Sequence, residues 1–214
     1  MSKMKLVAEK VCKTIRDAEI LRDINLELEE GTIYGFIGRN GSGKTMLFRA
    51  LSGLMGLTSG TVSLDGKQLH RDFAVLPSLG IVLEHIGLYP NLTGVENLLY
   101  LAQLTRKVGK AEIRNAILRV GLNPDDRRTY RKYSLGMKQR LAIAQAVMEG
   151  PNVIMLDEPT NGLDDDGVKK IRNLILEEKQ RGALILLASH NQDDIQILSD
   201  KLFRIDSGRL EELA

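Results

Sequence analysis

The sequence has a single cysteine, Cys12, no tryptophan, few aromatic residues and no long hydrophobic run. One cysteine cannot form a disulfide within the chain, which agrees with a reducing compartment such as the cytosol. We interpret Cys12 as a small residue near an early strand rather than as a reactive thiol. Apolar runs such as residues 183–189 have the length of a strand, far short of the ~20 residues that span a bilayer. If the protein serves a membrane, we expect another chain to supply the spanning helices.

The chain also lacks a strong charge of either sign. Its formal net charge is +2, whereas a dedicated nucleic-acid binder usually carries a strong basic field. We therefore expect no nucleic-acid partner. With 214 residues, 43% of them hydrophobic, the chain is long enough for one domain with a sizeable core.

Short apolar or β-rich runs alternate with helical patterns along most of the sequence, which predicts an α/β fold. Two runs, residues 153–156 and 183–188, are apolar throughout, as is typical of parallel strands that are covered on both faces. The other predicted strands are residues 24–28, 32–37, 61–64, 81–83 and 202–205. The predicted helices are residues 44–54, 95–105, 110–120, 135–148, 167–181 and 192–198.

The middle of the chain has helical patterns and no convincing strand. We predict a helical lobe at about residues 87–133, inserted into a core of residues 1–86 and 134–214, within one domain of residues 1–214. In this stretch Thr93 is a candidate helix cap and Glu96 completes a capping box. Gly121, followed by Pro124, is placed to end a helix.

Residues 38–45 fit the phosphate-binding pattern G-x-x-x-x-G-K-S/T, between an apolar strand and a helix. Glycine is needed because successive backbone N–H groups must wrap the phosphates without obstruction by side chains. The positive N-terminal end of the following helix points at the same anion. Lys44 adds a cation for the β and γ phosphates, and the Thr45 hydroxyl can ligate Mg²⁺. The expected nucleotide contacts here are Gly38, Asn40, Gly41, Ser42, Gly43, Lys44, Thr45 and Met46.

Two carboxylates, Asp157 and Glu158, end the apolar strand of residues 153–156. A buried parallel strand delivers such residues to the carboxyl edge of the sheet, where ligands of open α/β sheets bind. Asp157 can hold Mg²⁺ there. Glu158 is expected to point elsewhere, because strand side chains alternate. It can orient or deprotonate a water molecule in line with the γ-phosphate, as a phosphoryl-transfer site requires.

Three further motifs complete a resemblance. The sequence Tyr-Ser-Leu-Gly-Met-Lys-Gln-Arg at residues 133–140 is similar to the LSGGQ signature of ABC ATPases. Residues 159–164 resemble the D-loop of that family, and Ser189-His190 follows an apolar strand as its switch histidine does. In this order, with the phosphate loop and the acidic strand end, the motifs resemble an ABC nucleotide-binding domain over nearly the whole chain. A P-loop NTPase fold is implied, with a mostly parallel core sheet and an antiparallel β portion.

The resemblance implies an ATPase that uses ATP and Mg²⁺. Two copies would pair head to tail, each ATP lying between the phosphate loop of one copy and the signature of the other. Ser134 and Gly136, at a helix start, suit a γ-phosphate presented across such an interface. Asp164 would add a D-loop contact, and His190 would hold the attacking water. An integral membrane permease on a separate chain would be the partner, at the cytoplasmic face of the cell membrane.

Three departures from the family pattern carry further predictions. Leu135 replaces a signature glycine, and the string YSLGMKQR resembles bacitracin and lantibiotic exporters. Glu84 stands where the Q-loop glutamine is usual, and we predict that it ligates Mg²⁺. Ile15 stands where an aromatic residue normally stacks on adenine. Without that stacking, worth on the order of 1 kcal/mol, we expect weak discrimination between ATP and GTP.

Two alternatives to a transporter subunit stay open. One is a soluble ABC ATPase of the DNA-repair or translation type, although these usually have coiled coils or tandem cassettes. The other is a P-loop kinase for a small molecule, against which the signature, the D-loop and His190 argue. Neither the transported substrate nor the permease can be deduced from this chain.

Overall fold

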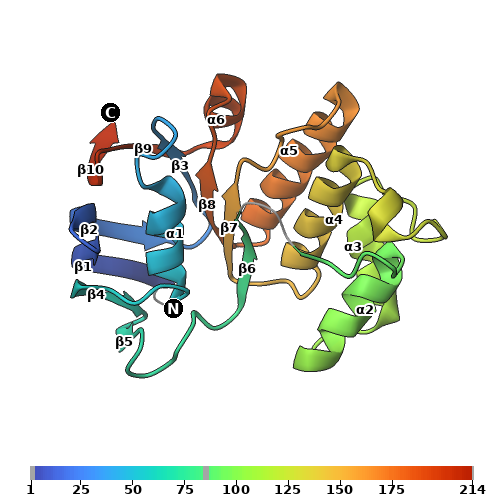
Figure 1. The fold of residues 1–214 in the computed structure, drawn as a ribbon, viewed down its shortest axis with the longest axis horizontal. Coiled ribbons are helices and arrows are strands. Elements are labelled where there is room, and N and C mark those ends of the chain that lie inside the picture. The colour runs from blue at the N-terminus through green and yellow to red at the C-terminus, as the bar shows by residue number, and fades with distance from the viewer. Residues whose placement is uncertain (1–2, 84–86, 214) are drawn as a thin grey trace.

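The computed structural model describes residues 3–83 and 87–213. Figure 1 shows an antiparallel sheet at one end of the molecule, a second sheet in the middle, and the helices α2 to α5 at the other end. The expected α/β class and the presence of both a parallel and an antiparallel portion are confirmed.

The antiparallel sheet has four strands in the order β2-β1-β4-β5. Its strands are β1 (Lys5–Ile15), β2 (Ala18–Glu29), β4 (Ser59–Leu64) and β5 (Lys67–Gln68). The sequence predicted only segments of β2 and β4. β1 was missed because its apolar and polar residues do not alternate regularly, and its pairing with β2 shifts register between Ala8 and Val11.

The central sheet has six strands in the order β10-β9-β3-β8-β7-β6. All neighbours pair in parallel except β9 and β10, which form a C-terminal antiparallel hairpin. The strands are β3 (Ile33–Ile37), β6 (Leu79–Val82), β7 (Val153–Asp157), β8 (Leu184–Ala188), β9 (Lys201–Asp206) and β10 (Arg209–Leu213). Every residue of β7 and β8 is buried, as the continuous apolar runs predicted.

Helices cover both faces of the central sheet. The six predicted helices are confirmed, with ends shifted by up to two residues. They are α1 (Lys44–Ser52), α2 (Gly94–Thr105), α3 (Lys110–Arg119), α4 (Leu135–Val147), α5 (Asp165–Gln180) and α6 (Gln192–Leu198), with a 3₁₀ turn η1 (Tyr130–Lys132) before α4. In the described ranges, no helix combines the length and the apolar character needed to cross a bilayer.

Alternation along the strands divides the core in two. On β7, Ile154 and Leu156 pack on the face covered by α4, α5 and α6. Val153 and Met155 pack on the opposite face, with α1 and the antiparallel sheet. The sheet is thus sandwiched, and its carboxyl edge is left between the layers for the loops that follow β3, β7 and β8.

Residues between β6 and α4 form α2, α3 and η1, at the far right of Figure 1. Thr93 and Glu96 cap α2 reciprocally: the Glu96 N–H donates to Thr93 Oγ1 (3.3 Å) and the Thr93 N–H to Glu96 Oε2 (2.7 Å). Gly121 has a φ of 74° just after α3, where the sequence predicted a helix end. The buried residues of these helices join the α4 side of the core rather than forming a separate cluster.

Candidate functional site

The loop between β3 and α1 contains glycines for two different reasons. A Cβ atom at Gly38 would lie 2.3 Å from the Ile205 carbonyl oxygen, so β9 leaves no room for a side chain. Gly41 has open space around it but a φ of 80°, and Gly43 has a φ of 113°, values that favour glycine. The chain therefore curls into a loop that ends at the first turn of α1, where backbone N–H groups lack helical partners.

Lys44 is already directed into this loop. Its ammonium donates to the carbonyls of Gly38 (2.7 Å) and Arg39 (3.3 Å), and only 7% of the residue is exposed. Ser42 Oγ is buried and has no hydrogen-bond partner among the described residues. An ammonium beside an unsatisfied hydroxyl, at a helix N-terminus, suits the oxygens of a polyphosphate.

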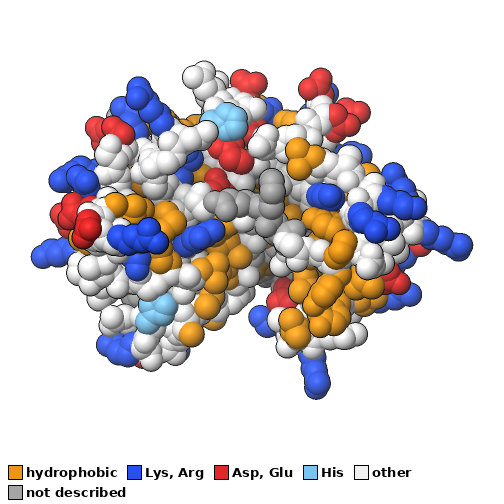
Figure 2. All heavy atoms as spheres, in the orientation of Figure 1, with side chains coloured by type: hydrophobic (Ala, Val, Ile, Leu, Met, Phe, Trp, Pro, Cys, Tyr) orange, Lys and Arg blue, Asp and Glu red, His pale blue; other side chains and the backbone are white. Residues whose placement is uncertain are grey.

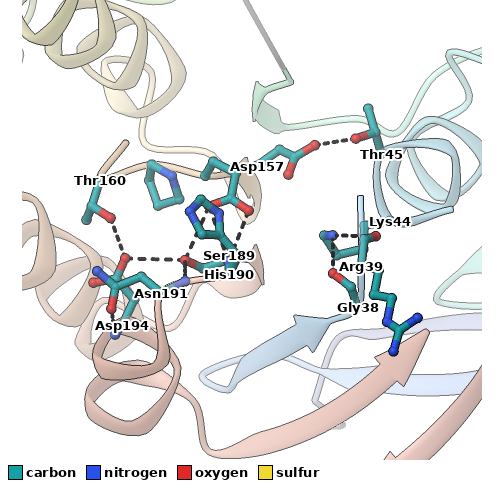
Figure 3. A network of polar contacts seen from close by, with 12 residues as sticks. Gly38, Arg39, Lys44, Thr45, Asp157, Thr160, Ser189, His190, Asn191 and Asp194 are labelled. Atoms are coloured by element: carbon teal, nitrogen blue, oxygen red, sulfur yellow. Dashed lines mark hydrogen bonds and ion pairs between the residues drawn. The ribbon is translucent and has the colours of Figure 1, made fainter. Parts of the chain in front are cut away.

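Thr45 and Asp157 meet across the site from different elements. Thr45 Oγ1, in the first turn of α1, donates to Asp157 Oδ2 at the end of β7 over 2.5 Å (Figure 3). Both are oxygen ligands of the kind Mg²⁺ accepts when phosphates and water complete its shell. The donor set fits the expected ion. Glu84, the third expected ligand, lies outside the described residues.

Glu158 and His190 form a close pair beside Asp157. His190 Nδ1 lies 2.7 Å from Glu158 Oε2, and the His190 N–H donates to Glu158 Oε1 (3.0 Å). Glu158 lies just beyond β7, with a φ of 51°. The expectation that strand alternation alone turns Glu158 away from Asp157 is thus incomplete, because the left-handed backbone also redirects it. A carboxylate aimed by a histidine can hold and deprotonate water.

Most of these groups border one cavity of about 820 Å³. Of the expected site residues, those that line it are Asn40, Gly41, Gly43, Lys44, Thr45, Met46, Asp157 and Glu158. Gly38 and His190 line a second cavity, of about 670 Å³. The volume and the mixed lining are in the range of small-molecule sites.

The signature residues lie at the N-terminal end of α4, where Leu135 lines the cavity and Ser134 and Gly136 do not. Ser134 caps α4 and its Oγ accepts from the Met137 N–H (3.2 Å), so the ordinary capping role coexists with the proposed one. A Cβ atom at Gly136 would lie 2.8 Å from the Gly162 carbonyl oxygen, which brings the D-loop against the signature. Asp164 caps α5. These three residues do not line the cavity of their own chain.

Five cavity residues were not among the expected nucleotide or metal contacts: Ile20, Arg49, Leu135, Gln139 and Asn161. Gln139 follows Leu135 by one helical turn, so the two share a face of α4, and Gln139 Nε2 donates to the Glu158 carbonyl (3.2 Å). That spacing could have identified Gln139. Ile20 lies on β2, where only the packing of two sheets brings it to the loop. Ile15, which was expected to contact the adenine ring, is 41% exposed and does not line this cavity.

Comparisons with known proteins agree with this geometry. A sequence profile described as "ABC transporter" matches residues 21–161. The uncharacterized ABC transporter ATP-binding protein YybJ of Bacillus subtilis is 44% identical and covers 93% of this chain, which in turn covers 91% of YybJ. The bacitracin transport ATP-binding protein BcrA of Enterococcus faecalis is 39% identical over 95% of this chain and 67% of its own length.

A solved dimeric structure of a bacterial ABC transporter cassette superposes with a TM-score of 0.86. It shares 23% identity and covers 98% of this chain and 99% of that cassette, a likeness that speaks to the fold. The sequence profile, the relatives and the fold therefore agree with the assignment that the phosphate loop, the acidic strand end and the signature indicate. The chain belongs to the ABC transporter family, among its ATP-binding proteins.

Proposed function

We propose that this chain is the ATP-hydrolysing subunit of an exporter for peptide antibiotics or drugs, and that it works as a head-to-tail pair. The observation that carries the enzymatic part is the convergence of Lys44, the Thr45–Asp157 pair and the Glu158–His190 pair on one loop region.

Each group has a distinct task in this proposal. Thr45 and Asp157 would hold Mg²⁺, which supplies charge neutralisation at the phosphates when bound. Lys44 and the loop N–H groups bind and orient the β and γ phosphates. Glu158 takes a proton from the attacking water, and His190 keeps the carboxylate and the water in place.

The position of two signature residues supports pairing. Within the signature, Leu135 lines the nucleotide cavity of its own chain, whereas Ser134 and Gly136, for which the family resemblance implies nucleotide contact, do not. A second copy in opposite orientation brings its signature to this loop. ATP then contacts both copies through the γ-phosphate, so the closed pair is favoured before hydrolysis and loses that contact afterwards.

An apolar surface near the helical region suits a membrane partner. Tyr100 and Leu104 of α2 are 45% and 75% exposed, and the Tyr89 ring packs edge-on against Tyr100 with centroids 4.9 Å apart. Figure 2 shows hydrophobic side chains gathered over α2 and, across a notch, over the core near β6. Buried Asn97 holds the Tyr89 backbone through two hydrogen bonds, so this surface is fixed rather than frayed. Exposed apolar surface of this kind marks an interaction site.

Export of a peptide antibiotic or drug rests on similarity to BcrA, which is named for bacitracin transport. The signature string YSLGMKQR also resembles that group. The permease, at the cytoplasmic face of the cell membrane, would define the substrate.

Fractionation of the cells that make this chain tests the transporter reading against a soluble ABC ATPase. The chain is expected in the membrane fraction together with a membrane protein. Tyr100→Ala/Leu104→Ala should release it while purified protein keeps its ATPase rate. Ile197→Ala on α6, also exposed, should leave fractionation unchanged. A wild-type chain found entirely in the soluble fraction, with full ATPase activity, would favour the soluble alternative.

A further inference from the structure

A buried carboxylate lies behind the Glu158–His190 pair and has no task in the reaction described above. Asp194, on α6, is completely buried. One of its oxygens, Oδ2, accepts hydrogen bonds from the hydroxyls of Thr160 and Ser189, the latter at 3.4 Å. Figure 3 shows Asp194 between these two side chains. A buried charge of this kind needs a reason, because its desolvation is costly.

The two hydroxyl partners flank the two catalytic groups. Thr160 follows Glu158 by two residues, and Ser189 directly precedes His190. Ser189 Oγ also lies 3.4 Å from Glu158 Oε2, so a single hydroxyl touches both the catalytic carboxylate and the buried one. The loop after β7 and the loop after β8 are therefore joined through Asp194 as well as through the direct contact of Glu158 with His190.

The other oxygen of Asp194 is anchored from a third element. Arg172 of α5 donates to Asp194 Oδ1 through Nε (2.7 Å) and Nη2 (2.6 Å). Both donors meet the same oxygen, so the contact anchors Oδ1 and leaves Oδ2 for other donors. Oδ2 accepts from Thr160 and Ser189 instead. Oδ1 thus anchors Asp194 to α5, and Oδ2 contacts the residues next to the catalytic pair.

We propose that Asp194 is a positioning residue for ATP hydrolysis, which holds Glu158 and His190 in the relative geometry that the attacking water requires. It acts through Thr160 and Ser189 and touches neither nucleotide nor water. The inference rests on the proposed role of Glu158 as the base. A plain structural ion pair between α5 and α6 is the competing explanation, and it predicts effects on folding alone.

Asp194→Asn is the first test, because it retains the shape and Oδ1 but places an NH₂ donor opposite two hydroxyls. We expect kcat to fall on the order of tenfold to a hundredfold, as small displacements of catalytic groups do. The dissociation constant for ATP should stay within about twofold, since the Lys44 loop is untouched. In a Glu158→Gln background, Asp194→Asn should still form the nucleotide-bridged pair of chains.

Thr160→Val and Ser189→Ala test the same path without disturbing the ion pair, and they serve if Asp194→Asn folds poorly. Each should lower kcat, and each should have little further effect when added to Asp194→Asn, because all three break one path. Arg172→Gln/Asp194→Asn removes both charges and should recover thermal stability relative to Asp194→Asn alone. Its kcat should stay low if Asp194 positions the catalytic pair.

Recovery of kcat together with stability in the double variant would overturn the positioning role, as would a normal kcat in both Thr160→Val and Ser189→Ala. The proposed function is judged separately by Glu158→Gln in the same assay. If that variant hydrolyses ATP at the wild-type rate, the proposed function fails, and the role of Asp194 falls with it. If Glu158→Gln is inactive while Asp194→Asn is fully active, only the role of Asp194 is lost.

Discussion

The Thr45 hydroxyl and the Asp157 carboxylate are joined by a hydrogen bond of 2.5 Å, although 112 residues separate them in the chain. They come from the first turn of α1 and from the end of β7, on the two sides of the cavity. Both proposed metal ligands are thus preassembled. A bound Mg²⁺ would take these two oxygens as ligands in place of their hydrogen bond.

Removal of the Thr45 hydroxyl should raise the Mg²⁺ requirement. We expect Thr45→Ala to need on the order of tenfold more free Mg²⁺ for half-maximal ATP hydrolysis, because one oxygen ligand is lost. Thr45→Ser is the matched control, since it keeps the hydroxyl, and should remain within about twofold of the wild type. Hydrolysis is measured against free Mg²⁺ at saturating ATP. An identical Mg²⁺ curve for Thr45→Ala would remove Thr45 from the metal site.

Glu158→Gln should separate nucleotide binding from hydrolysis. The amide cannot take the proton from water, so we expect kcat to fall by at least ~10²-fold while ATP still binds. Because the γ-phosphate contact then persists, the variant should elute as a dimer with ATP and as a monomer with ADP. Glu212→Gln, on the exposed β10, is a control that should hydrolyse ATP normally. A Glu158→Gln protein that stays monomeric with ATP contradicts the pairing scheme.

The two isoleucines near the phosphate loop should differ in their effect on nucleotide affinity. Ile20 lines the cavity, and its carbonyl oxygen would lie 3.3 Å from a Cβ atom at Gly43, whereas Ile15 is 41% exposed outside the cavity. We expect Ile20→Ala to weaken ATP binding about fivefold, through lost apolar contact. Ile15→Ala should weaken it less.

The same titrations with GTP test base selectivity. Both nucleotides should bind within about tenfold of each other, because the described cavity has no aromatic ring for stacking. A stronger preference for ATP, or a larger effect of Ile15→Ala than of Ile20→Ala, would restore Ile15 as the residue that contacts adenine.

The cap of α2 should make stability depend on pH in acid. Hydrogen bonds from the Thr93 N–H and, to a smaller extent, from the Thr93 hydroxyl hold the pKa of Glu96 below its usual value. The charged form is the one that is favoured in the folded state. Its stabilisation is therefore present above the pKa of the unfolded chain and is lost as the pH falls through the lowered folded pKa. The unfolding free energies of wild type and Glu96→Gln, measured in urea, should differ at neutral pH and converge in acid. A difference that stays constant with pH would contradict the cap as its source.

Much of this molecule could be predicted from local patterns. The apolar runs that became β7 and β8 and the capping box of Thr93 and Glu96 depend on neighbours in the sequence, and their prediction was correct. β10, with the sequence Arg-Leu-Glu-Glu-Leu, has no strand pattern of its own and forms because β9 offers an edge to pair with. The formation of β10 therefore depends on its pairing with β9 rather than on its own sequence.

The candidate site divides in the same way. Lys44, Thr45 and Asp157 belong to motifs with fixed spacing, and the structure brings them together. The orientation of Glu158 depends on its own left-handed backbone conformation. Glutamate adopts this conformation rarely, and sequence patterns do not predict it. Ile20 reaches the site only through contacts between distant elements, and Asp194, although it follows His190 by four residues, is linked to Glu158 only through Thr160 and Ser189, so sequence spacing predicts neither role.

Lys44 was found with its ammonium held by the carbonyls of Gly38 and Arg39. A lysine side chain normally gives up rotational freedom when it meets a ligand, at about 0.5–1.5 kcal/mol for each side chain that becomes ordered. Here that loss has already occurred during folding. Binding therefore needs only a change of partners at one nitrogen, and the energy of the phosphate contact remains available for closing two copies around it.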